Sequence, residues 1–188
     1  MRAYTPETIT DAVLGQMATT PDPRMKEIME AAVRHLHAFA REVNLTPAEW
    51  IKSLWPRKLI LKGILDVEDA KLATKTGADA IVVSNHGGRQ LDGAPSSISV
   101  LPGIADAVGS EIEVMFDGGI RSGQDLMRAL ALGARSCLIG RAYAYGLGAG
   151  GQAGVAKAID ILRKELDVTM ALAGISSISA IDRRALAT

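Results

Sequence analysis

Cysteine is almost absent from this 188-residue sequence, since Cys137 is the only one, and a disulfide within the chain is therefore impossible. A chain without disulfides is typical of a reducing compartment, and we expect a cytoplasmic location. The sequence also lacks an excess of either charge, because 21 Lys and Arg residues balance 21 Asp and Glu residues. No net electrostatic field is available to attract nucleic acid or an anionic membrane, so a small-molecule partner is expected.

Long apolar runs are absent as well. No stretch approaches the roughly 18 consecutive apolar residues of a membrane span, and the N-terminus has no apolar run of signal-peptide length. We therefore expect neither a membrane span nor a signal peptide. The composition of 48% hydrophobic and 22% charged residues is that of a globular protein able to bury a core.

The first 52 residues have the pattern of an all-α region. Start signals for helices occur at Thr5-Pro6, at Asp22-Pro23, and at Thr46 with Glu49, which together form a capping box. Apolar residues recur at helical spacing at Ile28, Ala32, Leu36, Phe39 and Val43.

Residues 53–188 change to short apolar runs that alternate with helical stretches, a pattern typical of parallel strands covered by helices. The expected strands are residues 59–62, 80–84, 113–116 and 136–139. Asp66 and Ser122 are predicted N-caps, and Gly77 and Gly133 are predicted to end helices in a left-handed conformation. Four such units predict an α/β fold, a half TIM-type barrel of four parallel strands preceded by the all-α region. In β/α barrels the chemistry lies at the carboxyl ends of the strands.

A histidine and an arginine follow the second expected strand on a glycine-rich loop, residues 84–93. The imidazole of His86 can accept a proton, and the guanidinium of Arg89 can hold a carboxylate through two parallel hydrogen bonds. The pair indicates a substrate with an acidic group and a proton to lose. Lys62, at the end of the first strand, could neutralise negative charge on a bound ring, although a solvated strand-end lysine is the commoner interpretation of such a residue taken alone.

A glycine-rich loop at residues 117–123 follows the third expected strand and enters a helix near Ser122. Glycines let the backbone approach a phosphate, and the start of the helix is expected to offer unpaired N–H groups beside Arg121. Gly140 and Arg141 repeat the arrangement after the last strand. Barrel phosphate sites are commonly formed after strands seven and eight, so these units are expected to be the last two of a barrel.

The chain from about residue 55 to 186 resembles the C-terminal half of the FMN-dependent α-hydroxy acid dehydrogenases and oxidases. The resemblance rests on residues 61–63, 84–92, 117–123, 129–134 and 139–141. It implies FMN as cofactor and oxidation of a small 2-hydroxy acid to a 2-oxo acid. It makes His86 the base and Arg89 the carboxylate partner, with no metal ligand. The residues implied to contact the flavin are Lys62, Ser84, Asp117, Gly119, Arg121, Gly140 and Arg141.

The units that supply the first four strands of that family's barrel, including an aspartate partner for the histidine, are not found in this sequence. Residues 1–50 instead resemble the N-terminal helical region of intradiol dioxygenases, on residues 19–24, 33–43 and 45–50. We therefore expect a fusion whose flavin site is catalytically incomplete, and a homo-oligomer. The alternatives are a non-catalytic assembly formed by self-association, a phosphate-binding barrel isomerase or aldolase with Lys62 as nucleophile, and an intradiol dioxygenase.

Overall fold

The computed structural model describes residues 23–24, 27, 31 and 47–186, which divide into two units, residues 1–57 and residues 58–188. The described part of the first unit contains helix α3 (Pro47–Leu54), with Glu49 in its first turn and Lys52 in its last. The start signals at Thr5, Asp22 and Thr46 lie outside the described residues, as does the apolar face from Ile28 to Val43. The division of the chain at residue 52 stays a prediction.

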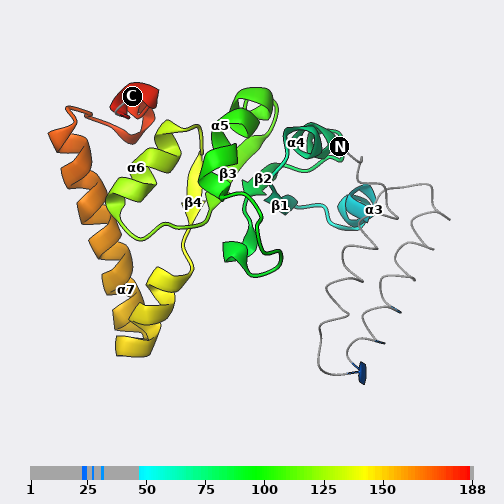
Figure 1. Cartoon of the computed structure of the whole chain (residues 1–188), viewed down its shortest axis with the longest axis horizontal. Coiled ribbons are helices and arrows are strands. Elements are labelled where there is room, and N and C mark those ends of the chain that lie inside the picture. The colour runs from blue at the N-terminus through cyan, green and yellow to red at the C-terminus, as the bar shows by residue number, and fades with distance from the viewer. Residues whose placement is uncertain (1–22, 25–26, 28–30, 32–46, 187–188) are drawn as a thin grey trace. The chain divides into compact units, whose positions relative to one another are not determined.

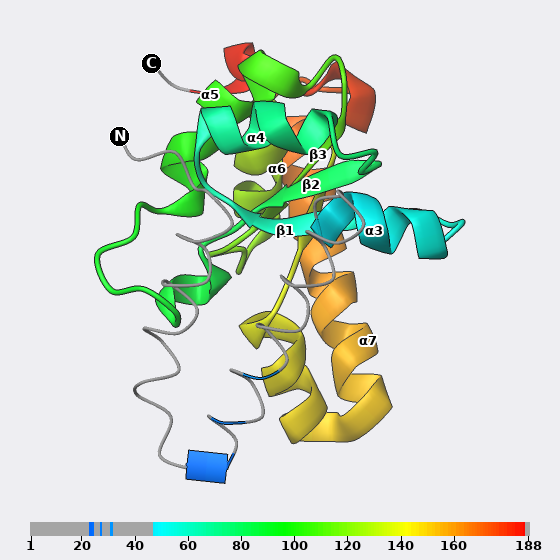
Figure 2. The same ribbon diagram turned by 90° about the vertical axis from the view of Figure 1, so that its right-hand side faces the viewer.

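The second unit is built on a sheet of four parallel strands in the order β1-β2-β3-β4 (Figure 1). The strands are β1 (Ile60–Ile64), β2 (Ala80–Val83), β3 (Glu113–Asp117) and β4 (Ser136–Leu138). Helices α4 (Val67–Thr74), α5 (Ser97–Val108) and α6 (Gly123–Ala131) connect them and cover one face of the sheet (Figure 2). The predicted partial α/β barrel of four parallel strands is confirmed.

The predicted helix starts at Asp66 and Ser122, and the predicted left-handed glycines Gly77 and Gly133, are confirmed. The Asp66 carboxylate accepts from the N–H groups of Glu68 and Asp69, and Ser122 forms a capping box with Asp125. Gly77 and Gly133 have φ of +77° and +106°, a conformation that a side chain disfavours. The strand ends differ by one or two residues from those predicted. The largest difference is in β1, where a bulge between Lys62 and Ile64 lets pairing continue to Ile64.

The core lies between the sheet and its three helices. Its fully buried residues include Ile81, Val83, Leu101, Ile104 and Phe116. Burying each such side chain contributes roughly 1.5–3 kcal/mol to folding. This core fixes the spacing of β2 and β3, and with it the positions of the residues that follow them.

Two residues separate β4 from helix α7 (Arg141–Leu172), which is broken where Gly150 and Gly151 leave the helical conformation. Its two arms pass so close that a Cβ atom on Gly146 would lie 2.5 Å from the carbonyl oxygen of Gly154. The second arm packs along α6 (Figure 1) through a small cluster around Met127, Leu166 and Met170. No helix in the described ranges is both long and apolar enough to cross a membrane.

The short helices η2 (Ile178–Ala180) and η3 (Arg183–Ala185) follow α7 and return the chain toward the helical layer. The Arg183 guanidinium donates to the Asp106 carboxylate on α5 at 2.6 Å. Both side chains are exposed, so this ion pair adds little to stability by itself. It places the end of the described chain beside α5.

Candidate active site

Three polar side chains from three strands meet at the carboxyl edge of the sheet. The Lys62 ammonium on β1 donates to the Asp117 carboxylate on β3 at 2.6 Å and to the Ser84 hydroxyl after β2 at 2.8 Å. The Ser84 hydroxyl also donates to Asp117 at 2.6 Å and accepts from the backbone N–H of His86 at 3.0 Å. Ser84 is fully buried, so these bonds satisfy a hydroxyl that has no access to water.

The surroundings of Asp117 act on its carboxyl in opposite directions. Burial alone would raise the pKa of Asp117, but hydrogen bonds from Lys62 and Ser84, with the positive charges of Lys62 and His86, outweigh it and lower the pKa. The carboxylate is therefore charged at neutral pH. Lys62, Ser84 and Asp117 form a pre-arranged polar cluster, which we call the strand-end cluster.

The strand-end cluster predicts a pH-dependent stability. Because the folded-state pKa of Asp117 lies below the unfolded value of about 3.9, its charged form stabilises the fold above about pH 4, and this contribution is lost as pH falls through the folded-state pKa. We expect Asp117→Asn to lower Tm at pH 7 by about 2–4 °C. The difference between variant and parent should shrink below pH 4. Thermal melts at several pH values measure this, and a pH-independent difference would contradict the role of the charge.

The loop after β2 holds His86 in an unusual backbone conformation. His86 has φ of +54°, and among the described residues it is the one non-glycine with a positive φ. Gly87 and Gly88, both at φ of +71°, continue the left-handed turn as the short helix η1 (His86–Gly88). Asn85 braces the turn, since its side-chain oxygen accepts from the Gly87 N–H and its amide donates to the Pro95 carbonyl.

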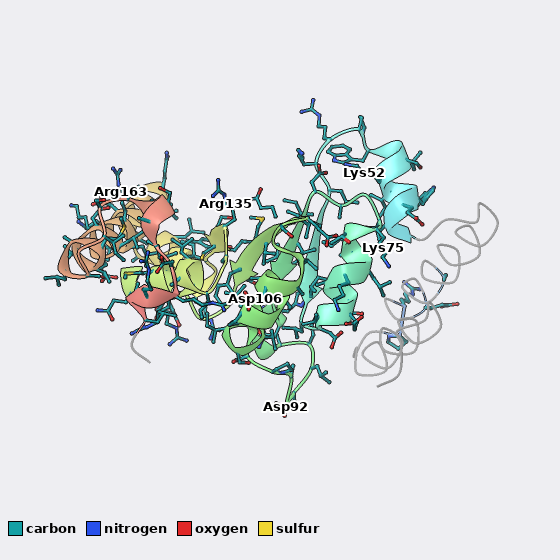
Figure 3. The ribbon with its side chains drawn as sticks, turned by 90° about the horizontal axis from the view of Figure 1, so that it is seen from above. Lys52, Lys75, Asp92, Asp106, Arg135 and Arg163 are labelled. Carbon is teal, nitrogen blue, oxygen red and sulfur yellow. The ribbon has the colours of Figure 1, made fainter. Side chains whose placement is uncertain are left out.

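The rest of this loop extends from the carboxyl edge of the sheet. Asp92 projects there on the side of the unit away from Arg135, which directly precedes β4 at the amino edge (Figure 3). The loop is exposed from Gly87 to Gly93. The chemistry-bearing residues are thus gathered at one edge, as the barrel pattern predicted.

A cavity of about 860 Å³ opens beside the strand-end cluster. Its volume is within the range of small-molecule and cofactor sites. Four cationic side chains and one carboxylate line it, together with His86 and several glycines. The predicted site residues among its lining are Lys62, His86, Arg89, Asp117, Gly119, Arg121, Gly140 and Arg141.

Ser84 is the one predicted site residue that does not line this cavity, because it lies buried beneath it in the strand-end cluster. Gly87, Gln90, Gly118 and Ile120 also line it and belong to the two predicted site loops, whereas sequence reasoning missed Leu138, Tyr143 and Ala144. Tyr143 and Ala144 were discoverable in principle, because residues in the first turn of a helix that starts at a site face that site. No comparable signal marked Leu138.

The expectation that the start of α6 offers unpaired N–H groups to a phosphate is wrong. Asp125 accepts from the backbone N–H groups of Arg121 and Ser122 at 3.1 and 3.0 Å. Glu165, from the second arm of α7, accepts from the N–H of Gly123 at 2.8 Å. Two carboxylates of the chain itself therefore occupy this helix start, and the capping box that Asp125 forms with Ser122 also closes it to an anion.

The start of α7 is different. Its N-cap residue, Gly140, has no side chain to cap the first turn, and Gly140, Arg141 and Tyr143 all line the cavity. A Cβ atom on Gly140 or Gly119 would meet no other atom within 4 Å, so open space adjoins both. An anion in the cavity can therefore approach both backbones closely and face the positive end of the helix dipole.

Comparison with known proteins identifies relatives of this chain. The model of a family described as FMN-dependent dehydrogenase matches residues 2–188. An L-lactate dehydrogenase of Caulobacter vibrioides is 53% identical over 149 residues, and one of Azorhizobium caulinodans is 54% identical over 148 residues; each match covers 79% of this chain and 39% of the relative. The chain thus spans about two fifths of the length of these relatives.

Solved structures of mandelate oxidase resemble this chain with a TM-score of 0.71 and 47% sequence identity. One is a variant with an FMN adduct, of which the match covers 44%, and another is a variant with (S)-mandelic acid, of which it covers 41%; each match covers 73% of this chain. The resemblance of residues 1–50 to dioxygenases stays a prediction. The matches in sequence and in structure agree, and the chain belongs to the FMN-dependent dehydrogenase family.

Proposed function

We propose that this chain is the FMN-binding part of an oxidoreductase that converts a small 2-hydroxy acid to a 2-oxo acid. The observation that carries the proposal is the single cavity lining in which Lys62, His86 and Arg89 lie together with Arg121 and Arg141. The matched L-lactate dehydrogenases and mandelate oxidases support the substrate class.

The cavity fits the phosphate end of FMN. Arg121 and Arg141 provide two permanent positive charges, and the uncapped start of α7 adds backbone N–H groups. Gly119 and Gly140 leave the space that a phosphate and ribityl chain need. Lys62 and Ser84 both donate to the Oδ2 atom of Asp117, so its Oδ1 atom would accept from ribityl hydroxyls.

The flavin ring would lie toward the strand-end cluster, where Lys62 can stabilise negative charge on it. When bound, FMN supplies an acceptor for two electrons. His86 would take a proton from the substrate, while Arg89 would pair with the substrate carboxylate. Within the described residues the His86 imidazole makes no hydrogen bond to a carboxylate, so the base lacks a group that fixes its tautomer.

The visible spectrum of the purified chain after addition of FMN and gel filtration tests the proposal. Retained flavin absorption at one FMN per chain is the expected result, and complete loss of flavin on the column would contradict it. Borohydride trapping tests the aldolase alternative, which needs Lys62 as a nucleophile. The ion pair between Lys62 and Asp117 disfavours that alternative, because a paired ammonium is a poor nucleophile.

We also propose that the chain self-associates. In the described unit β1 pairs only with β2 and β4 only with β3, so each has an edge without a strand partner. Ile60 on β1 is 47% exposed although it belongs to a strand. A second copy that supplied four more parallel strands would cover both edges, as a closed barrel does.

Sedimentation velocity at micromolar concentration measures this association, and we expect a dimer or larger species. Ile60→Lys should weaken the association by about tenfold or more, because it places a charge at the strand edge. Ile98→Lys is the matched control, since Ile98 is 36% exposed on the central helix α5, away from both edges. A well-folded parent monomer, or equal effects of the two substitutions, would contradict the proposal.

A further inference from the structure

The His86 imidazole lies directly against the backbone of β1 at Gly63. A Cβ atom placed on Gly63 would be 2.7 Å from Cε1 of His86, and 3.5 and 3.6 Å from its Nδ1 and Nε2. The ring therefore points its Cε1 corner, which lies between the two nitrogens, at Gly63. No side chain fits between this strand and the ring.

Gly63 stands at the one irregular point of β1. Its φ of +104° lies in the region that side chains disfavour, and it is the residue skipped in the pairing of β1 with β2. Continuous pairing through this position would require an extended residue with a side chain toward one face of the sheet. Glycine at the bulge, directly after Lys62, leaves no side chain at the point where the imidazole lies.

We propose that Gly63 is a positioning residue for His86, and that the bulge in β1 forms a seat for the imidazole. The seat works together with two backbone restraints, the bond from the His86 N–H to Ser84 and the brace provided by Asn85. The left-handed φ of His86 is uncommon for a residue with a side chain, so contacts around it must hold it in place. The inference rests on the proposed function only for the role of His86 as a base.

A positioned base needs such a seat because proton transfer depends steeply on geometry. A displacement of about 1 Å can cost about a hundredfold in rate. Gly63→Ala is expected to push the imidazole from its seat rather than to unfold the strand, since the obstructing group is a side chain that can rotate away. Gly93→Ala is the matched control, because Gly93 also has a positive φ, +75°, but nothing lies within 4 Å of its Cβ position.

A double-mutant cycle with His86→Ala separates the seat from backbone strain. Gly63→Ala should lower Tm in the parent by about 2–4 °C more than it does in the His86→Ala background, where the ring is gone. Gly93→Ala should lower Tm equally in both backgrounds. If Gly63→Ala alone does not fold, refolding of Gly63→Ala/His86→Ala supports the seat. Equal losses, or no folding in either background, overturn it.

Proton NMR supplies a direct readout that needs neither flavin nor turnover. The His86 Hε1 resonance, identified among the three histidines by its loss in His86→Ala, should show a nuclear Overhauser effect to the Gly63 Hα protons. This contact should persist in Gly93→Ala and disappear in Gly63→Ala. Absence of the contact in the parent, or its persistence in Gly63→Ala, would overturn the proposal without bearing on FMN binding.

Discussion

Arg141→Ala is expected to weaken FMN binding by at least tenfold, and up to about a hundredfold. Arg141 begins α7 and lines the cavity beside the uncapped Gly140, so its guanidinium and the helix start act on the same phosphate. Each charge-assisted hydrogen bond that is lost costs roughly 1.5–3 kcal/mol, and about 1.4 kcal/mol corresponds to a factor of ten in affinity. Flavin fluorescence titration measures the change.

Arg121→Ala should also weaken binding by about tenfold or more, but no more than Arg141→Ala does, because the helix start next to Arg121 is already occupied by Asp125 and Glu165. Arg128→Ala provides the control. Arg128 lies on α6 in an exposed ion pair with Asp125 and does not line the cavity, so FMN affinity should be unchanged. Unchanged affinity in both Arg121→Ala and Arg141→Ala would refute the phosphate site.

Turnover by this chain alone is expected to be undetectable, or orders of magnitude below that of a complete family member. A positioned general base typically contributes about 10²–10⁴-fold, and it works best with a partner that fixes its tautomer and stabilises its charged form. The charge of His86 helps to lower the pKa of Asp117, so the two groups lie near each other. The hydrogen bonds that the Asp117 carboxylate accepts, however, come from Lys62 and Ser84. Among the described residues, His86 therefore has no hydrogen-bonded counter-charge.

Reduction of a dye acceptor by the FMN-loaded chain with lactate, glycolate or mandelate measures this turnover. Any residual rate should fall further in His86→Ala, whereas His86→Ala should leave FMN affinity within about threefold of the parent because phosphate contacts dominate binding. Rapid dye reduction that depends on His86 would show that the chain is catalytically complete.

The sequence predicted the features that local residue patterns encode. The strands, the N-caps Asp66 and Ser122, and the left-handed glycines Gly77 and Gly133 each depend on a few neighbouring residues. The loops that carry His86, Arg89, Arg121 and Arg141 follow from the strand positions, because parallel strands bring their carboxyl ends together. Their place at the strand ends follows from this spacing, whereas the assignment of Lys62, Asp117 and Gly119 to a flavin came from the resemblance to the family.

The missed features depend on residues far apart in the chain. Glu165 caps α6 from 42 residues away, and the Lys62–Asp117 bond joins residues 55 apart. Neither of these two contacts could be predicted, because an N-cap residue or a lysine at a strand end does not indicate which distant residue will bond to it. The contact of Gly63 with His86 required a bulge, and nothing in a Leu-Lys-Gly sequence separates a bulge from a plain strand end.

The strand-end cluster links ligand occupancy to the alignment of three of the four strands. Lys62 on β1 and Asp117 on β3 line the cavity, and Ser84 at the end of β2 bonds to both beneath it, so a group bound against this cluster can be held only while β1, β2 and β3 remain aligned. A ligand that binds only the folded chain adds stability, about 2.7 kcal/mol at a concentration one hundred times its Kd. Bound FMN is therefore expected to slow proteolysis of this chain, independently of whether it turns over a substrate.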